Sequence, residues 1–227
     1  MAEGSNYRNC LEPICSKIRS LLISLTEEPS QYEQIASKTE FWIEYVLRQR
    51  FVTVSELAEG VSGVGWESGG SYASVGRFLK EFHGAPHRSE QAKSFVVQLC
   101  PEVLRWFAIA SVEDFWLSSG SGRIAIRGAP GFIRAASFVG HLIEWGLLSH
   151  DLVRQHLIKP LINQHNNCEH SYSAEAVRVN AIYQLFTTAG DTLLQGLLEA
   201  EDVQVCFQAL EFRREWIDGF DPVKLQV

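Results

Sequence analysis

The sequence predicts an all-α protein, arranged as a HEAT-like right-handed solenoid of about five antiparallel helix pairs. Three observations favour this fold: apolar residues recur every three or four positions, no convincing pair of strands occurs, and most connections are short. The chain has 227 residues, and repeats of about 40–47 residues would give about five pairs. We expect one helical-repeat domain over residues 1–227, with tails at 1–8 and 220–227.

The composition supports a globular chain and excludes several other classes. Hydrophobic residues make up 46% of the chain and charged residues 21%, so burial can offset the entropy lost on ordering. Five cysteines and 17 scattered glycines exclude a disulfide scaffold and a collagen-like chain. The net charge is −7, which disfavours a polyanion as the main partner.

The sequence also carries an expectation about location. Residues 1–20 contain charged side chains throughout and lack the apolar core of a signal peptide. No uncharged apolar run reaches the length of a membrane span. An odd number of cysteines without a secretory signal indicates reduced thiols. We therefore expect a cytoplasmic or nuclear protein that does not enter a membrane.

The first three helices are predicted from apolar stripes and end signals. Apolar residues over 10–25 lie on one face of a first helix, and Ser30 can cap the second helix after a turn at 26–29. Thr53 and Glu56 form a capping box for a short third helix.

Five glycines between positions 60 and 70 predict a flexible loop over 60–71. This loop does not have the glycine spacing or the Lys-Ser/Thr pair of a phosphate-binding loop.

The middle of the chain continues the helical pattern. A fourth helix should end at residues 83–86, and Ser89 should open the next one. Pro101 should kink or split that helix, because proline lacks an amide N–H. Residues 123–126 resemble a strand, but an isolated strand has nothing to pair with.

The last third contains the clearest helix signals. Residues 132–145 form one helix with Gly146 as a left-handed cap, and Ser149 opens another. A further helix begins near Ser173 and should end at Gly190, and the final helix covers about 202–217.

Four segments resemble the middle domain of the translation initiation factor 4G family. Residues 138–148 (FVGHLIEWGLL) are similar to its Phe-Ile-Gly-Glu-Leu helix that closes in Gly-Leu-Leu, and residues 181–193 to its Leu-Leu-Thr-Thr-x-Gly helix end. Residues 18–26 and 212–216 look like its opening and closing motifs. The resemblance is strongest over 130–193.

The resemblance implies a non-catalytic HEAT-type crescent that binds a DEAD-box RNA helicase in translation initiation or another step of mRNA metabolism. In this family the crescent holds the two helicase lobes near each other and promotes ATP turnover, which is a population shift. The first inter-helix turn and the last helix are the implied contacts, although Trp216 can equally be a core residue. These partner-binding candidates are Leu25, Thr26, Glu27, Glu28, Arg213, Arg214 and Trp216.

Several residues of these four segments have structural roles that can be explained without the resemblance. Gly140 inside a helix costs about 1 kcal/mol relative to alanine, which is acceptable where a neighbouring helix approaches closely. Thr187 and Thr188 can donate hydrogen bonds to carbonyls one turn back, before the cap at Gly190. His141 stands where the family usually has an acidic residue.

A direct RNA-binding module of the same fold is the alternative. Basic residues do not form one run, and the densest candidates are Arg48, Arg50, Arg123 and Arg127. Aromatic residues interleaved with them at stacking spacing are lacking, and residues 199–221 are locally acidic. RNA binding would weaken steeply with salt.

A small-molecule enzyme that uses His141, Glu144 or His150 is a third hypothesis, but we predict no catalytic residue, cofactor or metal. Residues 149–151 are Ser, His and Asp, the three residue types of a catalytic triad, yet three consecutive residues cannot converge on one atom. The cluster at 165–170 offers three potential ligands without the second pair that completes a zinc site.

Overall fold

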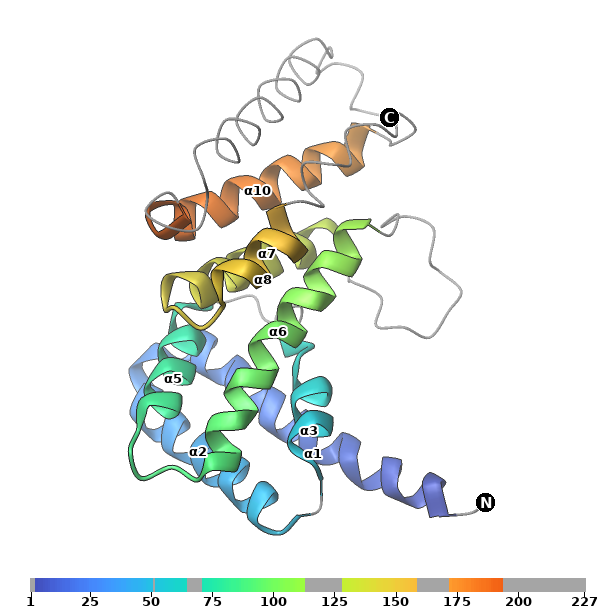
Figure 1. The fold of residues 1–227 in the computed structure, drawn as a ribbon, viewed down its shortest axis with the longest axis vertical. Helices are drawn as coiled ribbons and strands as arrows, with labels where there is room; N and C mark the ends of the chain where they lie inside the picture. The colour runs from blue at the N-terminus through green and yellow to red at the C-terminus, as the bar shows by residue number, and fades with distance from the viewer. Residues whose placement is uncertain (1–2, 51, 65–70, 113–127, 159–171, 194–227) are drawn as a thin grey trace.

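The computed structural model describes residues 3–50, 52–64, 71–112, 128–158 and 172–193. Every regular element in these ranges is helical and none is a strand, which confirms the all-α prediction for this part of the chain (Figure 1). None of the helices in the described ranges combines the length and apolarity needed to cross a membrane. The elements are α1 (Glu3–Glu27), the 3₁₀ turn η1 (Pro29–Gln31), α2 (Tyr32–Arg48), α3 (Val54–Val61), α5 (Ala73–Gly84), α6 (Glu90–Val112), α7 (Gly128–Glu144), α8 (His150–Val153), the π-helical turn η2 (Arg154–Ile158) and α10 (Tyr172–Thr192).

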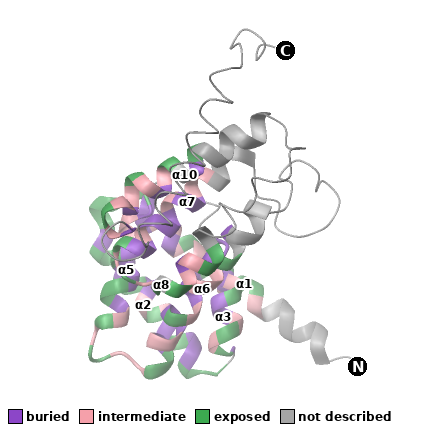
Figure 2. Ribbon diagram, turned by 45° about the horizontal axis from the view of Figure 1, so that its top comes forward, coloured by how far each residue is buried: buried purple, intermediate pink, exposed green. Residues whose placement is uncertain are grey.

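The helices pack in successive layers along the chain. The turn η1 joins α1 and α2 into a hairpin, and α1 also packs against α3 and α5. Helix α6 packs against α2, α3 and α5 and extends to α7, and α7 packs against α10 (Figure 1). Buried positions are concentrated between the helices, and exposed positions face outward (Figure 2).

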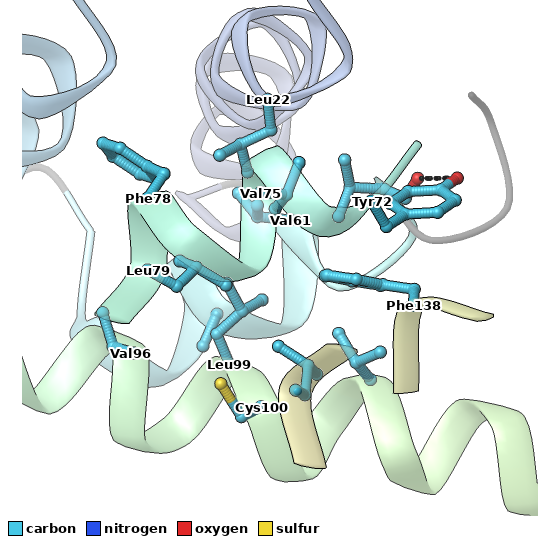
Figure 3. Packing of buried hydrophobic residues seen from close by; sticks show 14 of the residues in the cluster. Leu22, Val61, Tyr72, Val75, Phe78, Leu79, Val96, Leu99, Cys100 and Phe138 are labelled. Atoms are coloured by element: carbon cyan, nitrogen blue, oxygen red, sulfur yellow. Dashed lines mark hydrogen bonds between the residues drawn. The ribbon is translucent and has the colours of Figure 1, made fainter. Parts of the chain in front are cut away.

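One continuous apolar core joins these layers. Phe78 and Phe82 of α5 and Phe95 and Phe107 of α6 are almost fully buried. Where α5 begins, the ring of Tyr72 stacks on Phe138 of α7 at 4.8 Å between centroids, and its hydroxyl donates to the carbonyl of Val64 at 3.2 Å (Figure 3). The hydrogen bond satisfies a buried hydroxyl that would otherwise cost about 1–3 kcal/mol.

The start of the predicted flexible loop over 60–71 belongs to the folded core, where the carbonyl of Val64 accepts a hydrogen bond from Tyr72. Helix α3 extends to Val61, and residues 61–64 are buried. At the other end of the chain, α1 begins at Glu3, so residues 3–8 belong to a helix and not to a tail.

Two predicted helix ends are confirmed in detail. The Glu56 amide donates to the Thr53 hydroxyl at 3.2 Å and the Thr53 amide donates to the Glu56 carboxylate at 2.9 Å, which is a complete capping box. Gly146 has φ +66°, and the amides of Gly146 and Leu147 donate back to α7 carbonyls, each at 2.9 Å. This pattern is a Schellman motif.

Two other predictions of helix ends are wrong. Ser30 lies inside η1, because Pro29 starts a 3₁₀ turn there, and Gln31 precedes α2 without a side-chain cap. Gly190 lies within α10, which ends at Thr192.

Of the two effects predicted for Pro101, the split does not occur. Helix α6 continues through Pro101, and buried residues on both sides of it pack against neighbouring helices.

Some predictions lie outside the described residues. These are the strand-like segment 123–126, the polar cluster 165–170, the final helix over 202–217 and the tail over 220–227.

Gly140 allows α7 and α10 to approach closely, as the sequence predicts. A Cβ at Gly140 would lie 2.8 Å from the Cβ of Thr188, a distance that real Cβ atoms do not adopt. Thr188 cannot turn aside easily, because its hydroxyl donates to the carbonyl of Gln184 at 2.8 Å. Thr187 donates to the carbonyl of Tyr183 in the same way. The predicted roles of Gly140 and both threonines are confirmed.

We therefore expect Gly140→Ala to lower the free energy of unfolding by about 1–3 kcal/mol, because the added methyl group overpacks the α7–α10 contact. The matched control is Gly190→Ala in α10, where nothing lies within 4 Å of the added Cβ. That change should stabilise the protein by about 0.5–1 kcal/mol through helix propensity. Urea denaturation of both variants measures the difference, and equal effects would contradict this account.

Two buried cysteines are kept in the thiol form by the core. Burial raises the pKa of Cys15 to about 11 and that of Cys100 to about 12, above the ordinary value of 9.0. An acid whose pKa is raised on folding stabilises the native state below its unfolded pKa and loses this contribution at higher pH. Both thiols are therefore unreactive at neutral pH and destabilising in strong base.

Cys100→Val should flatten the loss of stability between pH 9 and pH 12. In the wild type, ionisation of Cys100 in the unfolded chain removes up to about 1.4 kcal/mol per pH unit in this window. Valine does not ionise, so the slope of unfolding free energy against pH should become shallower. Urea denaturation at several pH values measures it, and identical slopes would contradict the assignment.

Candidate functional site

Helix α2 exposes two large aromatic side chains. Phe41 is 63% exposed and Tyr45 is 42% exposed, whereas most large apolar residues of the described part are buried. Their rings stack at 5.9 Å with an interplanar angle of 15°. The half-buried ring of Trp42 meets both edge-on, at 6.2 and 6.0 Å. These contacts fix the exposed pair in one arrangement, which we call the aromatic ridge (Phe41 and Tyr45).

The aromatic ridge lines a hollow of about 460 Å³, which we call the α2 groove. Along α2 and its C-cap the lining positions are spaced by three or four residues, so they form one stripe on the outer face of the helix. Arg88, from the connection between α5 and α6, adds the remaining side chain. The lining residues are Ser37, Glu40, Phe41, Glu44, Tyr45, Arg48, Gln49 and Arg88.

The charges of the α2 groove compensate one another. Arg88 forms an ion pair with Glu40, and its guanidinium lies over the ring of Phe82 at 4.9 Å. The Nε of Arg48 lies 3.4 Å from a carboxylate oxygen of Glu44. Two carboxylates and two guanidinium groups leave the groove without net charge, so its field attracts neither a polyanion nor a polycation strongly.

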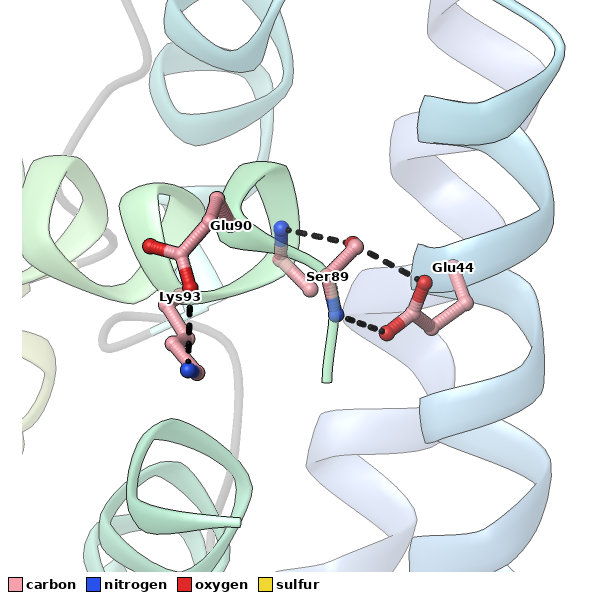
Figure 4. A network of polar contacts seen from close by, with 5 residues as sticks. Glu44, Ser89, Glu90 and Lys93 are labelled. Carbon is pink, nitrogen blue, oxygen red and sulfur yellow. Dashed lines mark hydrogen bonds and ion pairs between the residues drawn. The ribbon is translucent and has the colours of Figure 1, made fainter. Parts of the chain in front are cut away.

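Glu44 also fixes the groove to the rest of the fold. Its carboxylate accepts hydrogen bonds from the Ser89 amide at 3.2 Å and the Ser89 hydroxyl at 3.0 Å (Figure 4). The Ser89 oxygen in turn accepts from the Ala92 amide at 3.2 Å, which confirms Ser89 as the residue that opens α6. The groove therefore rests on a helix N-terminus and not on a loose loop.

The structure brings only part of the predicted partner-binding set to the surface. Leu25 is fully buried, and Thr26 is 7% exposed with its hydroxyl bonded to the carbonyl of Ile23, so these two predictions are corrected. They are buried because α1 continues through them and packs its apolar face inward. Glu27 and Glu28 are exposed. Arg213, Arg214 and Trp216 lie outside the described residues.

Of the predicted RNA contacts, Arg48 lies in the α2 groove beside the aromatic ridge. Arg50 is exposed just after α2, in a left-handed conformation with φ +55°. Arg123 and Arg127 lie outside the described residues. The expectation that no aromatic side chains accompany these bases is wrong for Arg48, because positions 41, 45 and 48 share one helix face.

The residues of the enzyme hypothesis do not meet the α2 groove. His141 Nδ1 lies 2.9 Å from a carboxylate oxygen of Glu144, one turn further along α7. His150 is the first residue of α8, and the Ser149 hydroxyl before it accepts from the Leu152 amide at 3.4 Å. No group of three or more His, Cys, Asp or Glu with metal-binding geometry occurs within the residues that the structure describes.

Comparisons with known proteins found no relative of this chain. No family model, no curated protein and no solved structure matches the chain.

Truncation of Glu44 should destabilise the protein and loosen the start of α6. We expect Glu44→Ala to cost about 1–2 kcal/mol, because the Ser89 amide and hydroxyl lose their acceptor. Glu33→Ala is the control, since that side chain is 88% exposed and lies 3.8 Å from Arg77. Thermal unfolding and amide exchange over residues 89–93 are the measurements; a control as destabilised as Glu44→Ala would refute the role of Glu44.

Proposed function

We propose that this chain is a non-catalytic helical scaffold that binds a protein partner through the outer face of α2. The observation that carries the proposal is the aromatic ridge, which is exposed, held in one arrangement and set in a groove without net charge. Aromatic side chains are enriched at protein interfaces and often supply much of the binding energy.

The finer form of the proposal follows the resemblance to the middle domain of initiation factor 4G. In it the chain is a HEAT-like right-handed solenoid of about five helix pairs, and the partner is a DEAD-box RNA helicase acting in translation initiation or mRNA metabolism. The tight α7–α10 contact at Gly140 and Thr188 supports this form, because these residues lie in the two segments that carry the strongest resemblance.

The proposed mechanism uses two contact regions on one helical hairpin. Glu27 and Glu28 are exposed at the turn between α1 and α2, and the α2 groove lies further along α2. The acidic turn suits a basic patch on one helicase lobe, while the groove holds an apolar segment. A scaffold that binds the closed arrangement of two lobes about tenfold better than the open one shifts their equilibrium by about 1.4 kcal/mol.

Direct RNA binding is the second candidate, and the position of Arg48 beside the aromatic ridge is the observation that favours it. Two facts weigh against it: Arg48 and Arg88 both face carboxylates, and the chain carries a net charge of −7. Filter binding to a single-stranded RNA at two salt concentrations separates the candidates.

The test of the scaffold is a pull-down with purified DEAD-box helicases, together with their ATPase rates. We expect a complex that stimulates ATP turnover, and a double change of Phe41→Ala and Tyr45→Ala should weaken it at least tenfold through loss of the aromatic anchors. Val97→Ala is the control, because Val97 is 57% exposed on α6 and should leave binding unchanged.

Failure to recover any helicase, with no change in ATPase rate, would count against the helicase as partner. Equal loss of binding in the Val97→Ala control would count against the α2 groove as the contact surface.

A further inference from the structure

Building on the proposed function, we propose that the α2 groove binds one amphipathic helix of the partner, antiparallel to α2. In chain order that helix carries an acidic residue, two apolar residues one turn apart, and a basic residue. The shape, the apolar surface and the charge order of the groove each constrain this ligand.

The shape of the groove fits a short helix. Its lining positions on α2 extend from Ser37 to Gln49, which is roughly 18 Å at 1.5 Å per residue. A helix of three to four turns has the same length, and its side-chain ridge can enter the groove formed by α2 and Arg88. Because Glu44 ties α2 to Ser89, this surface is present before the ligand arrives.

The aromatic ridge determines the apolar part of the ligand. Phe41 and Tyr45 are one helical turn apart, and their stacked rings present a flat apolar surface to solvent. Helices that bind in grooves use anchors at positions i and i+3 or i+4, which meet such a surface directly. The edge-on contacts of Trp42 limit ring rotation, so little entropy is lost when the anchors bind.

The accessible charges determine the direction of the ligand. Glu44 and Arg88 have side-chain exposures of only 9% and 13%, whereas Glu40 is 28% and Arg48 is 69% exposed. The groove therefore presents a carboxylate in its first half and a guanidinium at its end. An antiparallel helix places its N-terminal acidic residue at Arg48 and its C-terminal basic residue at Glu40. This distribution also suits the helix dipole, whereas a parallel helix would need both charges at unfavourable ends.

A second copy of the chain fits less well, although Glu40 and Glu44 also precede Arg48 along the groove face of α2. A two-fold contact places the same surface against itself, so two hollows of about 460 Å³ would face each other without filling. Single-stranded RNA would bring phosphates towards Glu40, whose charge repels them.

The experiment is a selection from a displayed library of four-turn helices, with the whole purified chain as bait. The library varies the residues of one helix face in a stable helical-hairpin host. We expect enriched clones to carry an acidic residue, then two apolar residues three or four positions apart, then a basic residue. Binding of these clones should fall at least tenfold with the double change of Phe41→Ala and Tyr45→Ala, and remain unchanged with Val97→Ala.

A charge exchange tests the direction. Arg48→Glu should weaken binding of the enriched clones, and clones in which lysine replaces the acidic residue should regain affinity for this variant but not for the wild type. The substituted side chains are exposed, so we expect each variant to fold. Thermal unfolding of each variant checks this.

Three results would overturn the inference. The first is no enrichment, or enriched clones that bind the aromatic-ridge variant equally well. The second is enrichment of the opposite charge order. The third is self-association in sedimentation equilibrium, or binding of a single-stranded RNA, that the aromatic-ridge variant abolishes. If the enriched clones bind as expected but the chain binds no helicase, the helicase is refuted as partner while the α2 groove stands as a helix-binding site. The two failures are therefore distinguishable.

Discussion

The outer surface of this protein depends on one nearly buried carboxylate. Burial of a charge is costly unless hydrogen bonds and an opposite charge compensate it. Glu44 receives both, from the amide and hydroxyl of Ser89 and from Arg48. These contacts join α2 to the residue that opens α6, 45 positions further along the chain. Together with the buried side chains of Ile43 and Val46, they are satisfied only when α2 faces Phe41 and Tyr45 outward.

Helix α6 transmits this constraint to the rest of the fold. It packs against α2, α3 and α5 and reaches α7, and its buried residues occur on both sides of Pro101. Proline removes one backbone hydrogen bond and crowds the preceding turn. Packing on several neighbouring helices compensates this local cost, as tertiary contacts often override helix propensity. The groove and the core therefore share one rigid helix and do not form separate units.

The sequence predicts features that depend on residues close together in the chain. The capping box at Thr53 and the left-handed cap at Gly146 are of this kind, because local geometry determines them. The aromatic ridge was not predicted, since apolar spacing alone does not say which of two neighbouring stripes on α2 is buried. The continuation of α6 through Pro101 and the burial of Leu25 depend on contacts between distant segments, which no local pattern contains.

Pairing decides how Arg48 contributes to binding. From the sequence alone, Arg48 is a basic residue that could contact phosphate. In the fold, its Nε faces a carboxylate oxygen of Glu44. Arg48 is the exposed member of this ion pair, so a partner carboxylate can share its guanidinium while Glu44 keeps its contacts. A charge shared in this way adds specificity and direction more than affinity. In the proposed interaction the affinity must then come from the apolar surface of Phe41 and Tyr45, which is why the proposal of a protein partner rests on the aromatic ridge and not on the basic residue.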